Sequence, residues 1–127
     1  EELSCKKYAE DKWTIKEVLQ HIIDAERIFN YRALCFARKD QNALPSFDEN
    51  GYALNSKAND REWQNLISEF IAVRKSTEYL FDSFNDETLN STGKASDYVI
   101  SVSALGFVII GHVNHHIRII QERYIGV

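Results

Sequence analysis

Three long segments of the chain carry apolar residues at the spacing of one face of an α-helix, and this pattern strongly limits the possible folds. The segments span residues 14–39, 59–83 and about 101–123. The chain between them shows no apolar alternation of the kind that indicates a strand. An all-α, up-and-down helical bundle is therefore predicted, with residues 1–127 forming one domain.

The start of each predicted helix carries a residue whose side chain can accept a backbone hydrogen bond. The first has a capping-box pattern, in which an N-cap threonine is followed three residues later by glutamate. The expected N-caps are Thr14, with Glu17 completing the box, Asn59 or Asp60, and Ser101 or Ser103.

Residues 40–57 form the one long loop between these helices, and they contain the only proline, Pro45. A short helical turn is expected at 48–54. Ordered loops of this length in compact domains are often functional. The loop is therefore a candidate border of a site.

The third segment is apolar on nearly every side, which predicts a helix buried on most of its surface. Three helices close a core poorly around such a helix. A fourth helix is therefore expected, either from residues absent from this chain or from a partner chain, and a homodimer is the expected assembly. The apolar residues are Val102, Leu105, Phe107, Val108, Ile109, Ile110, Val113, Ile117, Ile119 and Ile120.

Charge and hydropathy exclude two classes of partner. The net charge is −4, which gives no basic surface for nucleic acid. No apolar run reaches the roughly 18 residues that a membrane span needs, and no signal segment opens the chain. Cys5 and Cys35 form no CxxC pair, which suits a reducing cytoplasm.

The four histidines suggest a metal site. His112 and His116 are four residues apart, so they lie on one face of the third helix, in line with apolar core positions. His115 belongs to a neighbouring, more polar line. His21 lies on a partly apolar face of the first helix. In an up-and-down bundle the first and third helices can be neighbours, which would let His21 face His112 and His116.

Three neutral imidazoles with no fourth protein ligand form an open site of the catalytic type. Nitrogen ligands suit zinc, nickel and other late first-row metals. Such a metal lowers the pKa of bound water or thiol and so supplies a nucleophile at neutral pH. Asp24 or Glu49 is the candidate proton acceptor or ligand-orienting carboxylate.

The histidines have two other possible interpretations. Buried histidines are often core residues whose ring nitrogens are satisfied by hydrogen bonds. A di-iron bundle needs Glu-x-x-His on two helices. Here Glu17 precedes His21 by four residues, and neither His112 nor His116 has a glutamate three residues before it. The di-iron interpretation is therefore disfavoured.

Some charged residues fall on apolar helix faces and need partners there. Glu26 and Arg74 are expected to form a structural ion pair between the first two helices. The alternative is that Arg74 or Arg32 meets an anionic substrate. Cys35 is expected to be a small core residue.

Several motifs follow one another along the chain: Lys12-Trp13-Thr14-Ile15 through Arg27, Tyr31-Arg32-Ala33-Leu34 with Phe36-Ala37-Arg38, Leu44-Pro45-Ser46-Phe47-Asp48-Glu49, Glu69-Phe70 through Arg74, and Gly111-His112 through Tyr124. In this order they resemble the DinB-like (DinB/YfiT) superfamily over about residues 8–125. That family implies a four-helix bundle with nickel or zinc held by three histidines, here His21, His112 and His116. Its members include thiol-dependent transferases and isomerases, in which the metal is thought to activate a low-molecular-weight thiol, and metal-dependent hydrolases.

The resemblance departs from the family at the start of the chain. The family's first helix precedes the Lys-Trp-[Ser/Thr]-Ile motif, and only about a dozen residues stand there. Most of that helix is therefore expected to be missing. The expected function is a metal-dependent enzyme acting on a small molecule, a thiol-dependent S-transferase or a hydrolase. The alternative is a non-catalytic binding or stress-response bundle with structural histidines.

Overall fold

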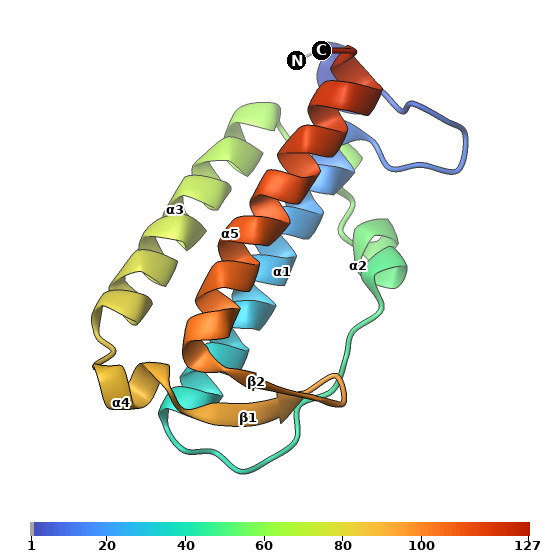
Figure 1. Cartoon of the computed structure of the whole chain (residues 1–127). Helices are drawn as coiled ribbons and strands as arrows, with labels where there is room; N and C mark the ends of the chain where they lie inside the picture. Colours follow the sequence, from blue (N-terminus) through green and yellow to red (C-terminus); the bar gives the residue numbers. More distant parts are fainter. Residues whose placement is uncertain (1) are drawn as a thin grey trace.

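A computed structural model describes residues 2–127 and shows a helical bundle with one small hairpin (Figure 1). Its three long helices are α1 (Ile15–Ala37), α3 (Trp63–Asp82) and α5 (Val102–Ile119). A π-helical turn, η3 (Ile120–Ile125), continues α5. The short elements are η1 (Glu2–Cys5), α2 (Glu49–Asn55), η2 (Ala58–Asp60) and α4 (Asp86–Leu89). The mainly helical bundle is confirmed. The predicted up-and-down order is wrong, because the long loop leads the chain back along the bundle, so that α3 runs parallel to α1 and α5 runs antiparallel to both (Figure 1).

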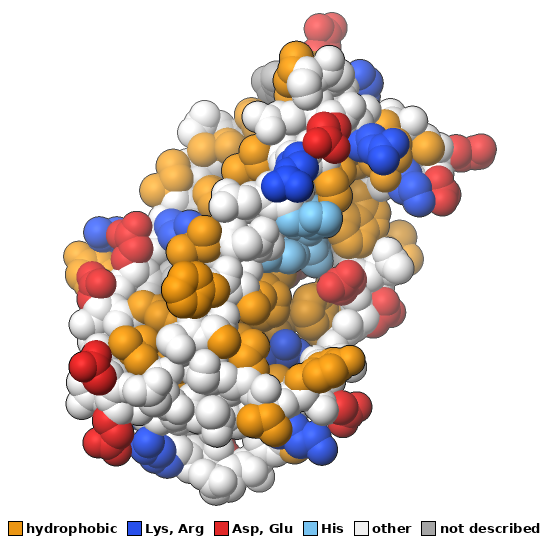
Figure 2. Space-filling model, in the orientation of Figure 1, with side chains coloured by type: hydrophobic (Ala, Val, Ile, Leu, Met, Phe, Trp, Pro, Cys, Tyr) orange, Lys and Arg blue, Asp and Glu red, His pale blue; other side chains and the backbone are white. Residues whose placement is uncertain are grey.

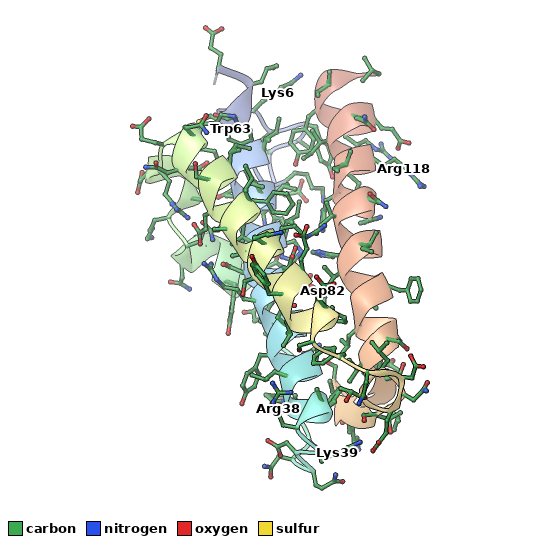
Figure 3. The ribbon with its side chains drawn as sticks, turned by 90° about the vertical axis from the view of Figure 1, so that its left-hand side faces the viewer. Lys6, Arg38, Lys39, Trp63, Asp82 and Arg118 are labelled. Atoms are coloured by element: carbon green, nitrogen blue, oxygen red, sulfur yellow. The ribbon has the colours of Figure 1, made fainter. Side chains whose placement is uncertain are left out.

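Helix α1 is the central element, because α3 and α5 both pack against it (Figures 1 and 3). It starts with the predicted capping box: Thr14 Oγ1 accepts from the Glu17 amide at 3.1 Å, and Glu17 Oε2 accepts from the Thr14 amide at 2.7 Å. Its sides are buried by both neighbours, and Ile23 and Ala25 have no exposed surface. Residues on α1 can therefore reach both other long helices.

The prediction that the third helix is buried on most of its surface is wrong, since only Val102, Leu105 and Ile109 are buried. Helix α5 packs one face against α1, and its outer face leaves Phe107 77% and Ile110 54% exposed. Between α5 and α3 lies a cavity of about 530 Å³, lined in part by Gly106 and Phe81. The predicted fourth helix and homodimer, which would cover this face, stay predictions.

The prediction of no strands is also corrected. Strands β1 (Thr92–Ala95) and β2 (Tyr98–Ser101) form an antiparallel hairpin in which Thr92 faces Ser101. Four-residue strands are too short to show a clear alternation. Ser96 and Asp97 form the turn, with φ of 50° and 66°. Glycine or asparagine usually occupies such positions, and the sequence has neither here to indicate a hairpin turn. A bridge from Leu44 to Ala95 joins the long loop to this hairpin.

The other predicted boundaries are close to the observed ones, with one exception at α3. Its N-cap is Glu62, whose side chain makes no capping bond. Asn59 and Asp60 lie in η2 instead, and Asn59 Oδ1 accepts a hydrogen bond from Thr14 Oγ1 at 2.6 Å. Ser101 caps α5 as predicted. The short helical turn expected at 48–54 is α2.

A helix that crosses a membrane must be both long and apolar. Among the described residues, no helix combines the length and the apolar character that a membrane crossing requires.

Because Gly93 has no side chain, the hairpin can approach the core closely at this position. A Cβ atom at this position would overlap the ring of Phe36, which is 1% exposed. A Gly93→Ala variant is therefore expected to lower the free energy of unfolding by about 1–3 kcal/mol, through overpacking. Denaturant unfolding monitored by circular dichroism measures this change.

Gly111 provides the matched control, because a Cβ there meets open space on a helix. Gly111→Ala is expected to raise stability by up to about 1 kcal/mol, since alanine has the better helix propensity. Equal effects of the two variants would contradict the packing argument.

Candidate metal centre

Helices α1 and α5 run antiparallel beside each other and bring three histidines together (Figure 1). His21 comes from the middle of the first half of α1 and is 4% exposed. His112 and His116 are partly buried and lie one turn apart on α5. The three residues that the sequence predicted as ligands therefore meet in one place.

The Nε2 atoms of these histidines point at one another. Nε2 of His112 lies 2.9 Å from Nε2 of His21 and 3.1 Å from Nε2 of His116. All three ligating atoms are within 4.8 Å of one another. Nitrogens bound to one ion at about 2.0–2.1 Å, at angles of roughly 90–110°, lie about 2.9–3.4 Å apart. Both separations from His112 lie in this range, so the donor set has the type and spacing that a metal site needs.

Hydrogen bonding alone satisfies this cluster less well. A neutral imidazole nitrogen is either one donor or one acceptor. Nε2 of His112 has two imidazole nitrogens at bonding distance and can form a strong bond with only one of them. A single cation at the meeting point would satisfy all three lone pairs. This argument favours the metal site over the interpretation of hydrogen-bonded core histidines.

Aromatic rings enclose the histidines on two sides. The Trp13 ring centroid is 4.9 Å from that of His21, and the Phe29 centroid is 5.6 Å from that of His112. These apolar walls were not predicted as part of the site. Phe29 follows His21 by eight residues, which on a helix is close to the same face, and that spacing was the available signal.

Space for a small molecule adjoins the cluster. A cavity of about 190 Å³ is bordered by His116, and Tyr8, Trp13 and Asn50 also line it. Figure 2 shows the histidines at the rim of a hollow in the surface, with apolar side chains beside them. The cluster is therefore open to this cavity on the side of His116.

Burial keeps all three imidazoles neutral near pH 7. It lowers the pKa of His112 to about 4, and the neighbouring His21 adds to this effect. It lowers the pKa of His116 to about 3, with further lowering from His112 and His21. Burial also lowers the pKa of His21. The neutral form is the one that binds a metal.

The two predicted carboxylates lie in different places. Asp24 accepts a hydrogen bond from Gln20 at 2.9 Å and has Arg27, Arg61 and Glu69 as its charged neighbours. Burial raises the pKa of Asp24. It is not among the groups that gather around the histidine nitrogens.

Glu49, at the start of α2, acts electrostatically on the centre. Its carboxylate acts on His112, raising the pKa of that histidine against the larger lowering by burial. The side chain of Glu49 is exposed to solvent. Of the two predicted proton acceptors, Glu49 is the better placed.

His115 lies outside the cluster. Its ring contacts the ring of His116 edge-on, with centroids 5.2 Å apart, and its side chain is exposed. This arrangement follows from its position one residue off the core-facing line of α5.

The predicted ion pair between Glu26 and Arg74 is confirmed. Arg74 donates from Nε at 2.8 Å and from Nη2 at 2.9 Å to the two carboxylate oxygens, and Thr77 Oγ1 donates at 2.6 Å. Glu26 is 2% exposed. Because these partners satisfy the carboxylate, the pair is structural. Cys35, 7% exposed, is a core residue as predicted.

Fold and site together define a helical bundle in which three histidines from two antiparallel helices surround a potential metal position. The family model of the DinB superfamily matches residues 1–120, and the chain belongs to this superfamily.

A solved structure shares the fold. It is described as "YfiT from Bacillus subtilis is a probable metal-dependent hydrolase with an unusual four-helix bundle topology", and it is similar to this chain with a TM-score of 0.82 and 17% sequence identity. The similarity covers 95% of this chain and 70% of that one. A comparison with curated proteins gives no match.

Removing one ligand is expected to weaken metal binding sharply. His116→Ala should lower the affinity for Zn²⁺ or Ni²⁺ by at least about 100-fold, because losing a residue that merely supports a ligand already costs 10- to 100-fold. Calorimetric titration and elemental analysis after dialysis measure the effect. His115→Ala is the matched control and should bind like the wild type. Equal loss in both variants would argue against the cluster as the site.

The metal-free protein is expected to lose stability as the pH falls from about 6.5 to 4. Unfolded histidines take up protons below about pH 6.5, whereas His112 and His116 stay neutral in the folded state down to about pH 4 and 3. The unfolded state therefore binds more protons in this window, so stability is full above it and decreases below it. Thermal unfolding at several pH values measures the trend.

A variant with both His112→Asn and His116→Asn is the comparison for this pH series. The groups whose charges act on these histidines, Glu49, Glu26, His115 and His21, remain unchanged. Its unfolding temperature should depend less on pH in the same window. An unchanged slope would show that other groups cause the acid sensitivity.

Proposed function

We propose that this protein is a metal-dependent hydrolase in which His21, His112 and His116 hold a divalent ion, zinc or nickel. The observation that carries the proposal is that three neutral nitrogens converge on one point, while no carboxylate or thiol among residues 2–127 joins them. Structural zinc sites have four protein ligands, whereas catalytic sites keep a position open. Three donors therefore favour catalysis.

A divalent ion bound here supplies Lewis-acid chemistry that lowers the pKa of adjacent water. Glu49 then acts as general base and takes a proton from the attacking water onto its carboxylate. The water oxygen forms a bond to the electrophilic carbon, the bond to the leaving group breaks, and the proton passes from Glu49 to that group. Trp13 and Phe29 exclude bulk water from two sides of the centre.

The fold comparison supports this choice of reaction. The similar Bacillus subtilis protein is described as a probable metal-dependent hydrolase. The cavity beside His116, about 190 Å³, has room for part of a small molecule. A small-molecule substrate is therefore part of the proposal.

Transfer of a low-molecular-weight thiol is the second reaction that this centre would support, since such a metal also lowers the pKa of a thiol. It follows from the family resemblance, and the same three histidines would serve it. Supplying cysteine or glutathione with the electrophile monochlorobimane separates the two reactions. Metal-dependent thiol consumption without ester hydrolysis would favour the transferase.

The Zn²⁺-loaded protein is expected to hydrolyse 4-nitrophenyl acetate, and dipicolinate should abolish this activity. Glu49→Gln should lower kcat by about 100-fold or more, because it removes the general base while keeping the shape of the side chain. Release of 4-nitrophenolate measures the rate.

Asp24→Asn is the matched variant, because Asp24 is a carboxylate of the same bundle whose partners lie toward α3. Its kcat should decrease much less than that of Glu49→Gln. Hydrolysis that persists in dipicolinate and in His116→Ala would exclude the proposed centre. It would favour the non-catalytic alternative, in which the histidines are structural.

A further inference from the structure

Arg32 is a buried arginine on the same face of α1 as His21. It follows His21 by 11 residues, three turns, which places it about 16 Å farther along the helix axis. Its exposed fraction is 8%. Between the two residues this face carries Ala25 and Ile28, so no charge intervenes.

No carboxylate among the described residues forms an ion pair with Arg32. Its Nη2 donates to the carbonyl oxygen of Pro45 at 2.9 Å and to Ser96 Oγ at 3.1 Å, and both acceptors are neutral. Burial lowers the pKa of its guanidinium, and no charge counters that effect. A buried cation without a counter-charge is costly, which suggests that a ligand supplies the charge.

The other partly buried arginines on this bundle are paired. Arg74 binds the two oxygens of Glu26, and Arg61 lies 2.6 Å from Glu69. The same network includes Arg27, which is exposed. Arg32 is therefore distinct, since it is more buried than these arginines and has weaker partners.

Part of the Arg32 guanidinium remains free to bind. A guanidinium has five N–H donors, and the two hydrogen bonds formed use only Nη2. Asn30 Oδ1 is the only side-chain polar atom among residues 2–127 that is both sealed from solvent and unpaired. The Nε and Nη1 groups of Arg32 are therefore accessible from outside.

A hollow in the surface runs from the histidines toward the hairpin (Figure 2). Its floor includes a basic surface. The bonds to Pro45 and Ser96 place Arg32 at the hairpin end, where the long loop and the β1–β2 turn meet. Apolar surface borders the hollow.

We propose that Arg32 binds a carboxylate of the substrate, which an apolar chain connects to the bond that reacts at the histidine centre. This proposal rests on the proposed function, because it names the substrate class of the same site. A carboxylate fits better than a phosphate, since one guanidinium balances a single negative charge. Pro45 and Ser96 hold the guanidinium in place and so act as positioning residues.

Binding to the metal-free protein tests this anchor separately from any reaction. Calorimetric titration compares hexanoate and octanoate with 1-hexanol and 1-octanol. Each acid should bind about tenfold more tightly than the alcohol of equal length, since a hydrogen bond to a charged group contributes enough for such a factor. Arg32→Gln should abolish this preference, and Arg32→Lys should keep part of it.

Arg38→Gln is the matched control, because Arg38 lies at the exposed end of the same helix (Figure 3). It should bind octanoate like the wild type. Circular dichroism confirms that each variant is folded, and Arg32→Lys tests the anchor if Arg32→Gln unfolds. Equal affinity for acid and alcohol, no binding of octanoate, or equal loss in Arg32→Gln and Arg38→Gln overturns the proposal.

The Zn²⁺-loaded protein then separates failure of the anchor from failure of the hydrolase. With the 4-nitrophenyl monoester of suberic acid, which carries a free carboxylate, Arg32→Gln should raise KM about tenfold and leave KM for 4-nitrophenyl octanoate unchanged. Metal-dependent hydrolysis without a carboxylate preference overturns the role of Arg32 alone. Octanoate binding that depends on Arg32 without any hydrolysis supports the anchor and rejects the hydrolase.

Discussion

Polar side chains buried along α1 determine how the other long helices pack, because each of them needs a partner inside the protein. Glu26, 2% exposed, is held by Arg74 of α3 through two hydrogen bonds. His21, 4% exposed, meets His112 and His116 of α5. Burying a charge or an imidazole without a partner costs several kcal/mol. The registers of α3 and α5 against α1 are therefore tied to these few contacts, while apolar burial supplies most of the stability.

These buried polar groups fall into two kinds, and the difference separates structure from function. The Glu26 carboxylate is saturated by Arg74 and Thr77, so it has no capacity left for a ligand. The histidine nitrogens face one another and lack a common partner, and Arg32 has donors to spare. Buried polar groups with bonding capacity to spare are typical of a binding site.

The fold is retained with little sequence identity. At 17% identity the chain still superimposes on the Bacillus subtilis protein with a TM-score of 0.82. Packing tolerates many combinations of apolar residues when their volume and spacing are kept. The chemistry tolerates much less, because a metal site depends on the position of a few nitrogen atoms.

The sequence by itself determined the long helices, the caps at Thr14 and Ser101, and the shared face of His112 and His116, because these depend on local periodicity and hydrogen bonding. Only the tertiary structure decided the rest. It turned Asp24 toward α3, exposed one face of α5, and formed a hairpin from strands too short to show alternation. It also left Arg32 without an ion pair to any carboxylate of residues 2–127. These outcomes depend on which segments, distant in the sequence, pack together, and local patterns do not contain that information.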